Sequence, residues 1–464
     1  MTPSSPEPAA ASARAAPHAA PVDLQGAIAS AASGQQDALS RRHKTVTTLV
    51  LLALAALIAA FSMLSLGKTG SADLLAAWLA GDAVAQGHPA LIYPADDTVF
   101  TMQPPVEWIA RTRELGYAGE IFPYIYPPLW AWVMAPVARL MVPETLAVLA
   151  HGVNAALLFA SLLIARRLCR KPPPLALWLM VGLLAYFGTN AGFLGLYQNQ
   201  PQILVAFLTL LALERAQNGA PILGGALLAL AAALKLYPVL LAILWLARRQ
   251  YRPFVAFVIL GGTLAALSVA VAGWPLHQRF LELIRMITDS VLITSVNYTT
   301  DGLLAQSFWA HALTVVFEQS SDGLRGWLIM AKPASFAFTS RLLQLMALAA
   351  LFWLGRRLSR RPEADPAAFW GAAMVILSLT SPLSWAYHYL APLSFAALLP
   401  ARYGRRGLAL LVLILLPTEP HLSLVNFDAL PSLVFGQVTG TLSMMLLAAC
   451  LIWIALRPGT APRT

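Results

Sequence analysis

The chain has 464 residues, of which 58% are hydrophobic and only 11% are charged, and its mean hydropathy is +0.68. Soluble domains carry about a quarter charged residues, so this composition excludes a water-soluble fold. The formal net charge is +10, but the lysines and arginines stand in short clusters beside apolar runs. That distribution is typical of membrane orientation signals and does not indicate nucleic-acid binding.

Apolar runs recur along the chain, many of them near the roughly 20 residues that a helix needs to cross a bilayer. These runs are continuous and lack the alternation of transmembrane β-strands. We therefore expect an all-α, polytopic transmembrane protein with about 12 crossings. The expected helices cover about 46–66, 144–165, 174–195, 200–216, 221–236, 238–247, 253–273, 336–355, 367–383, 388–400, 407–418 and 434–456. Segment 128–142 must then be re-entrant or lie at the surface.

The basic clusters assign a side to each loop, because cytoplasmic loops concentrate lysine and arginine. They predict a multi-pass protein with both termini in the cytoplasm, and we expect it in the plasma (bacterial inner) membrane. Residues 1–44 are expected to be a disordered cytoplasmic tail, 45–457 the membrane domain and 458–464 a second cytoplasmic tail. Two extracytoplasmic loops are predicted at about 68–126 and 274–335, the second with amphipathic helices.

Asp73 is the first acid after the first apolar run, so it is expected at the outer interface. A partly desolvated carboxylate there has a raised pKa and can take a proton from an attacking hydroxyl. The alternative is a solvated loop acid or a helix N-cap.

Two other ionisable residues fall on the same predicted side. Lys235 lies in an otherwise apolar stretch next to Pro238, and intramembrane cations are usually paired with an anion. A lipid donor's phosphate is the partner we favour, and snorkelling to the headgroups is the alternative. His388 can bind phosphate or relay a proton, although a lone histidine is often only hydrogen-bonded.

Polar and aromatic residues on this side are candidates for binding substrate. Tyr126 belongs to an aromatic and proline-rich run that is also typical of an interfacial belt. Gln200 and Gln202 lie in an amide-rich run that can bind sugar hydroxyls or simply be hydrated. The remaining candidates precede His388 in the chain and are Ser384, Trp385 and Tyr387.

The sequence contains no metal-ligand pair at helical spacing, glycine-rich phosphate loop or nucleotide-binding fingerprint. An extracytoplasmic enzyme without a nucleotide site needs a donor that is already activated and membrane-borne, and a polyprenyl-phosphate sugar meets that need. We expect no cofactor and leave a metal requirement open. The expected partners are membrane lipids, this donor and a lipid or glycan acceptor, and we expect no nucleic acid.

The order of these motifs resembles that of glycosyltransferase family 87 over roughly residues 45–400. The similar elements are Asp73 through Gly87 to Leu91-Ile92-Tyr93, Tyr126-Pro127-Pro128 with Pro136, Asn199-Gln200-Pro201-Gln202, Lys235 with Pro238, and Ser381-Pro382-Leu383-Ser384-Trp385 with His388. Two elements depart from the family pattern: only the glutamine of Gly-Gln-x-Asn is kept, and Tyr387 replaces the first of two histidines.

The resemblance implies a GT-C-like fold and inverting transfer of a hexosyl (mannosyl-like) or pentosyl residue from a polyprenyl-phosphate sugar. Asp73 would be the general base, and Lys235 and His388 would hold the donor phosphate. The rival interpretation is a transporter or lipid flippase, which also explains buried polar residues. Transporters often show two related halves, and the sequence has no such repeat.

Overall fold

The computed structural model describes residues 24–67, 71–94, 100–117, 119–317, 326–422 and 432–457. The chain divides into two units, residues 1–54 and 55–464. Helix α1 (Leu24–Leu66) begins in the first unit, so residues 24–44 of the expected N-terminal tail are helical. The rest of that tail, residues 1–23, and the expected C-terminal tail lie outside the described residues.

The second unit consists almost entirely of helices. They are α2 (Ala72–Ala85), α3 (Val106–Glu114), α4 (Pro128–Leu140), α5 (Pro143–Leu168), α6 (Leu175–Phe187), α7 (Asn190–Tyr197), α8 (Gln202–Gln217), α9 (Pro221–Leu234), α10 (Pro238–Ala247), α11 (Tyr251–Ala272), α12 (Trp274–Thr288), α13 (Thr300–Phe308), α14 (Ala334–Leu358), α15 (Pro366–Leu379), α16 (Leu390–Leu393), α17 (Leu398–Tyr403), α18 (Arg405–Leu415) and α19 (Ser432–Leu456). Short 3₁₀ turns are η1 (Pro89–Leu91), η2 (Ala310–Ala312), η3 (Ala386–Tyr389) and η4 (Leu416–Thr418).

Prolines set the start of several helices. Pro128, Pro143, Pro221, Pro238 and Pro366 each occupy the first residue of a helix. The fixed φ of proline suits this position, and the missing N–H costs nothing there because the first helical N–H groups have no intrahelical partner. The proline punctuation in the sequence therefore determines where helices of this unit begin.

Five of the described helices are long and apolar enough to cross a membrane: Thr45–Leu66 of α1, together with α5, α11, α14 and the Val434–Leu456 part of α19. The pair α6 and α7 makes a sixth if its 65° bend is counted within one span. The apolar windows of α11 and α14 are only 11% and 17% buried, so these faces are suited to contact lipid. The chain is therefore a helical membrane protein, whereas the expected count of about 12 crossings stays a prediction.

The structure departs from the expected helices at two places. The predicted helix 174–195 is broken between α6 and α7. The predicted helix 388–400 is instead the succession η3, α16 and α17. Pro392 and Pro400 lie in that segment, and since proline removes a backbone donor, one continuous helix cannot keep its hydrogen-bond ladder there.

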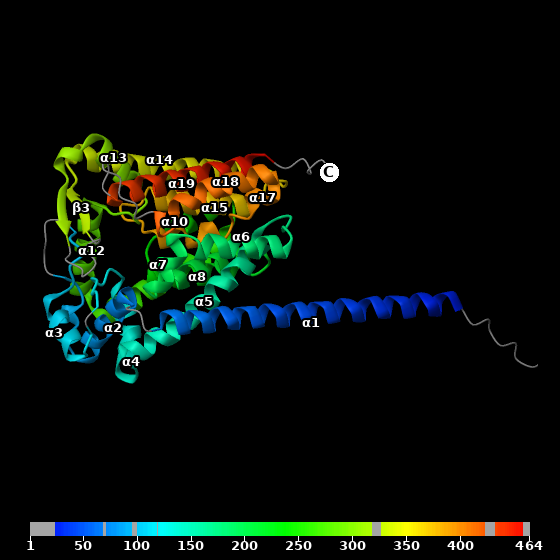
Figure 1. Ribbon diagram of the computed structural model, residues 1–464, viewed down its shortest axis with the longest axis horizontal. Helices are drawn as coiled ribbons and strands as arrows, with labels where there is room; N and C mark the ends of the chain where they lie inside the picture. Colours follow the sequence, from blue (N-terminus) through cyan, green and yellow to red (C-terminus); the bar gives the residue numbers. More distant parts are fainter. Residues whose placement is uncertain are drawn as a thin grey trace, which may run out of the picture. The chain divides into compact units, whose positions relative to one another are not determined.

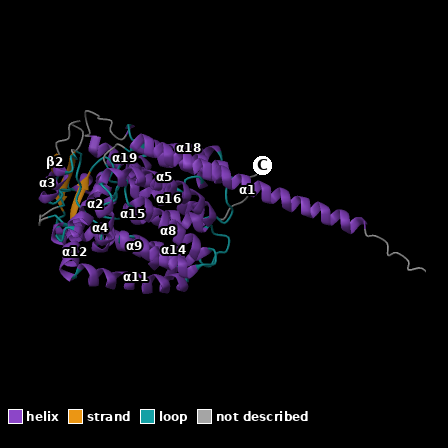
Figure 2. Cartoon of the chain, turned by 90° about the horizontal axis from the view of Figure 1, so that it is seen from below, coloured by secondary structure: helices purple, strands orange, loops and turns teal. Residues whose placement is uncertain are grey.

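The two segments expected to be outer loops fold together at one end of this unit, where α2, α3, α12 and the strands gather (Figures 1 and 2). The amphipathic helix expected after residue 274 is α12, which buries Phe280, Leu283 and Ile287. Three short antiparallel strands, which we did not expect, form a sheet in the order β1-β3-β2; they are β1 (Ser290–Ile293), β2 (Thr314–Phe317) and β3 (Gly326–Ala331). A single hydrophobic core joins α2, α4, α12 and this sheet.

Candidate active site

Asp73 lies in the first turn of α2, where the chain leaves its first apolar helix. The side-chain amide of Gln200 donates a hydrogen bond to its carboxylate, and the charge of Lys235 is close enough to stabilise the ionised form. Burial nevertheless dominates and raises the pKa of Asp73 to about 6. A carboxylate with this pKa is suited to act as a base near neutral pH.

Lys235 separates α9 from α10, and its extended backbone ends α9 two residues before the N-terminal proline of α10 is reached through Leu236 and Tyr237. Its Nζ lies 5.4 Å from the ring centroid of Tyr126 and 5.2 Å from that of Tyr387, so the two rings flank the ammonium group. Burial lowers the pKa of Lys235 to about 8, while the charge of Asp73 acts in the opposite direction.

His388 is the second protonatable group beside this lysine. Its Nε2 lies 3.4 Å from Lys235 Nζ, and its Nδ1 lies 3.2 Å from the carbonyl oxygen of Trp385. Because a carbonyl only accepts, Nδ1 carries the proton and Nε2 accepts from the ammonium group. Burial, aided by the charge of Lys235, lowers the pKa of His388 well below its ordinary value, so the ring is neutral.

Gln200 connects the carboxylate with the aromatic wall. The hydroxyl of Tyr126 donates to Gln200 Oε1 at 2.8 Å, and the Gln200 side chain also hydrogen-bonds the hydroxyl of Tyr387. Gln202 reaches the ionisable groups only through Tyr237. Its Nε2 donates to the Tyr237 hydroxyl at 2.8 Å, and the Tyr237 ring packs edge-on against His388.

Ser384 and Trp385 serve this region in different ways. Ser384 contributes through its backbone, which donates to Asn297 and accepts from the Tyr298 amide. Trp385 stacks on Tyr387 with ring centroids 6.4 Å apart, and its carbonyl fixes His388. Most of the predicted site residues therefore form one group in the structure: Asp73, Tyr126, Gln200, Lys235, Tyr387 and His388. Gln202 and Trp385 lie behind this group, and Ser384 supports it through its backbone.

Accessibility differs between the ionisable groups and their surroundings. Asp73, Lys235 and His388 are half-buried, whereas the side chains around them are at most 5% exposed; these are Tyr126, Gln200, Gln202 and Tyr387. A rigid, desolvated wall around three reachable ionisable groups is the arrangement expected of a binding or catalytic site.

Three residues of this region were not among the sequence-predicted candidates: Gln198, Asn199 and Tyr237. The Gln198 side chain accepts from the Ala72 amide at 3.0 Å, and Asn199 donates to Ser71 Oγ at 2.9 Å. All three lie inside runs that had drawn attention to Gln200 and Lys235. The sequence signal was present, but it could not assign separate roles to neighbouring amides.

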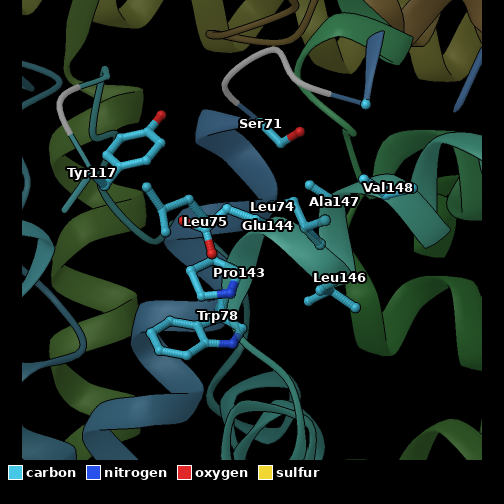
Figure 3. A pocket seen from close by; sticks show the side chains of 11 residues that line it. Ser71, Leu74, Leu75, Trp78, Tyr117, Pro143, Glu144, Leu146, Ala147 and Val148 are labelled. Atoms are coloured by element: carbon cyan, nitrogen blue, oxygen red, sulfur yellow. The ribbon is translucent and has the colours of Figure 1, made fainter. Parts of the chain in front are cut away.

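Two cavities adjoin α2 and α9. A groove of about 560 Å³ between α4, α9, α11 and α12 is lined without any Lys, Arg, Asp or Glu, and it includes Pro127 and Leu236, the direct neighbours of Tyr126 and Lys235. A second cavity of about 420 Å³ borders Leu74, Leu75 and Trp78 on α2 and the N-cap residue Ser71, and Glu144 and Tyr117 also line it (Figure 3). The groove offers an apolar surface beside the cation, and the second cavity lies on the other side of α2 from Asp73.

Among the described residues, no group of three or more His, Cys, Asp or Glu side chains is placed to hold a metal ion. The sequence model of glycosyltransferase family 87 matches residues 124–382, which is more than half of the chain. This match is narrower than the resemblance noted from the motifs, and it includes Lys235 but neither Asp73 nor His388. The search of curated proteins gave no match.

Proposed function

The chain belongs to glycosyltransferase family 87 and is a membrane glycosyltransferase, and we propose that it transfers a hexosyl or pentosyl residue from a polyprenyl-phosphate sugar to a lipid or glycan acceptor. The observation that carries this proposal is the meeting of one carboxylate, Asp73, with the Lys235 and His388 pair in a single partly accessible site. Transfer from a sugar phosphate needs a base for the acceptor and a cation for the leaving phosphate, and this group offers both.

In the proposed reaction, Asp73 takes the proton of an acceptor hydroxyl as its oxygen attacks the anomeric carbon. The bond between that carbon and the phosphate oxygen breaks on the opposite face, so the configuration inverts and polyprenyl phosphate leaves. Lys235 stabilises the charge that grows on this phosphate, and His388 holds the ammonium group in place. Bound phosphate would raise the pKa of His388 and allow it to donate as well.

The apolar groove supports a lipid-linked donor. Its lining includes Ala229, Ala233, Val258 and Ala265, and α11 exposes most of its apolar window, so a hydrocarbon chain can enter it from the bilayer. The groove adjoins Lys235 through Leu236, which would place the phosphate end of such a lipid beside the ammonium group.

We extend the proposal to topology and location. The shorter apolar helices α9, α10 and α15, together with α8, α18 and the segment from α16 to α17, would enter the bilayer with the longer ones, giving about a dozen crossings of a GT-C-like domain. The end that carries the sheet and α2 would face the extracytoplasmic side of the plasma membrane, with both termini in the cytoplasm.

Replacement of Asp73 by Asn tests the assignment. Purified enzyme in detergent is given a synthetic polyprenyl-phosphate mannose or arabinose and a lipid acceptor, and radiolabelled product is measured. Asp73→Asn should lower kcat by about 10³-fold or more while the protein elutes and melts like the wild type. Asp289→Asn, at an exposed acid at the end of α12, is the matched control.

Transfer by wild-type enzyme in detergent needs no gradient and no second compartment, so it also separates a transferase from a transporter or flippase. Full activity of Asp73→Asn would refute the role of the carboxylate.

A further inference from the structure

The first turn of α2 is held by three consecutive amides from the turn between α7 and α8. Gln198 Oε1 accepts from the Ala72 N–H at 3.0 Å, Asn199 Nδ2 donates to Ser71 Oγ at 2.9 Å, and the Gln200 amide donates to Asp73. Three neighbouring residues of one segment thus meet three neighbouring residues of the other.

These contacts take over the role of a helix cap. Ser71 stands at the N-cap of α2, but its side chain makes no capping hydrogen bond. The Ala72 N–H, which has no acceptor within the helix, is paired by Gln198 instead. The start of the helix that carries Asp73 is therefore fixed by a segment that lies 126 residues away in the chain.

The conformation of Asn199 shows why an asparagine suits this place. Its φ is +47°, and the Asn199 and Gln200 amides donate back to Leu196 and Gly195, the hydrogen-bond pattern that closes a helix with a left-handed residue. Glycine is the usual residue there, and asparagine tolerates the conformation while adding a side chain. That side chain is fully used, since Nδ2 also donates to Ala147 O at 3.0 Å and Oδ1 accepts from Asn154 at 3.0 Å.

Packing leaves a cavity on one side of this turn. Ser71, Leu74, Leu75 and Trp78 line the cavity of about 420 Å³ (Figure 3). Because a helix has about 3.6 residues per turn, the position of Asp73 in the sequence puts it on the opposite face of α2. A helix end beside open space can shift, and a shift of about 1 Å at a reacting group can cost on the order of 100-fold in rate.

We propose that Gln198 and Asn199 are positioning residues that hold the first turn of α2 and thereby aim the Asp73 carboxylate at the acceptor hydroxyl. This inference rests on the proposed function, because it assumes that Asp73 is the base. In this proposal Gln198 and Asn199 support Asp73 and do not contact the sugar, which is bound by side chains with accessible surface.

One substitution separates the side-chain contacts of Asn199 from its backbone conformation. Asn199→Gly keeps the left-handed turn, which glycine favours, and removes only the side-chain contacts to Ser71, Ala147 and Asn154. We expect kcat to fall about 10- to 100-fold while the KM for the lipid donor changes less than about threefold. The acidic limb of the kcat profile should move to lower pH, because a carboxylate freed from its place gains water and its pKa falls. Asn218→Gly, at the far end of α8, is the matched control.

Gln198 supplies a second, independent comparison. Gln198→Glu keeps an acceptor for the Ala72 N–H and should retain more than about a third of the wild-type kcat, whereas Gln198→Met should lose about 10-fold. If Asn199→Gly unfolds, this pair carries the test alone.

The outcomes distinguish failure of the positioning role from failure of the proposed function. Wild-type kcat and an unmoved pH profile in both Asn199→Gly and Gln198→Met, with Asp73→Asn inactive, would overturn the positioning role alone. Absence of transfer by the wild type, or transfer by Asp73→Asn, would instead refute the proposed function. Equal losses in Gln198→Glu and Gln198→Met, without a shift of the acidic limb, would show that the contacts serve only the fold.

Discussion

Lys235 Nζ and His388 Nε2 lie 3.4 Å apart, although 153 residues separate them in the chain. The imidazole is the acceptor of the ammonium group, because its Nδ1 proton is engaged by the Trp385 carbonyl. The pair is therefore one cation held by a neutral ring, and it would act on a phosphate as a unit.

This coupling predicts a non-additive double-mutant cycle. Lys235→Met and His388→Asn should each lower kcat/KM for a polyprenyl-phosphate sugar by about 100-fold, because either change removes or misplaces the same charge. The double variant should lose less than the product of the two, with a coupling energy of about 1–2 kcal/mol. A cycle between Lys235→Met and Asp289→Asn is the control and should be additive. Additivity in the first cycle would mean that the two side chains act separately.

The pH dependence of transfer should be bell-shaped. The folded-state pKa of Asp73 is raised to about 6, so the carboxylate loses its proton and the rate rises as pH increases through that value. The pKa of Lys235 is lowered to about 8, so its charge, and with it phosphate stabilisation, is lost as pH rises further. The profile of kcat/KM for the free enzyme should fall on both sides of a maximum near pH 7.

The two limbs can be assigned by substitution. Lys235→Met should abolish the alkaline limb at about pH 8 in the residual activity and should also move the acidic limb upward, because the positive charge no longer lowers the pKa of Asp73. An acidic limb that stays in place or moves down would contradict the assignment.

Much of the fold could be predicted from the sequence, because continuous apolar runs and proline starts are local signals. The helix expected at 238–247 is observed with those bounds, and the expected helices near 144–165 and 434–456 extend by only a few residues. The breaks at Gly188 and at residues 394–397 were missed, since each lies within a continuous apolar run. The small sheet was missed because its strands have only four to six residues and are stabilised mainly by their pairing across the chain.

The candidate site was partly foreseeable for a physical reason. A charge in an apolar run is costly, so Lys235 stood out without any knowledge of its partners. The separate roles of Gln198, Asn199 and Gln200 could not be predicted, because three consecutive amides look alike in a sequence and differ only in what they face. Local composition thus located the polar turn, and tertiary contacts alone decide what each of its side chains does.

The apolar groove predicts a selective effect of donor length. Gly262 lines it, and a Cβ atom added there meets no atom within 4 Å, so we expect Gly262→Trp to fold with its ring in the groove. We expect the KM for a long polyprenyl donor to rise about 10-fold or more, since several buried methylene groups lose their place. A water-soluble donor with a single isoprenoid unit should be affected less than about twofold, because it does not reach that part of the groove.

Gly273→Ala is not a suitable control for this experiment, because the φ of Gly273 is +78° and a side chain there is strained. Ala334→Trp, on the exposed start of α14, adds the same bulk away from the groove. Equal KM changes for the long and the short donor would place the lipid chain elsewhere.

A buried ion pair between α13 and the segment that joins β3 to α14 predicts a large effect on stability without a direct effect on chemistry. Lys332 Nζ contacts Asp301 Oδ2 at 2.7 Å and the Thr288 carbonyl at 2.6 Å, and Ser340 donates to the same carboxylate oxygen at 2.9 Å. The Lys332 and Asp301 side chains are 1% and 2% exposed, so removal of either partner strands a charge in a dry environment.

Lys332→Met should therefore destabilise the protein by about 3–5 kcal/mol, visible as a lower melting temperature in detergent. Adding Asp301→Asn to Lys332→Met should recover part of this loss, because no unpaired charge is then left buried. The exposed pair of Arg341 with Asp289 is the control, and Arg341→Met should cost at most about 1 kcal/mol. A double variant less stable than Lys332→Met would show that the Asp301 carboxylate stabilises this region through its contact with Ser340 rather than through the charge of its partner.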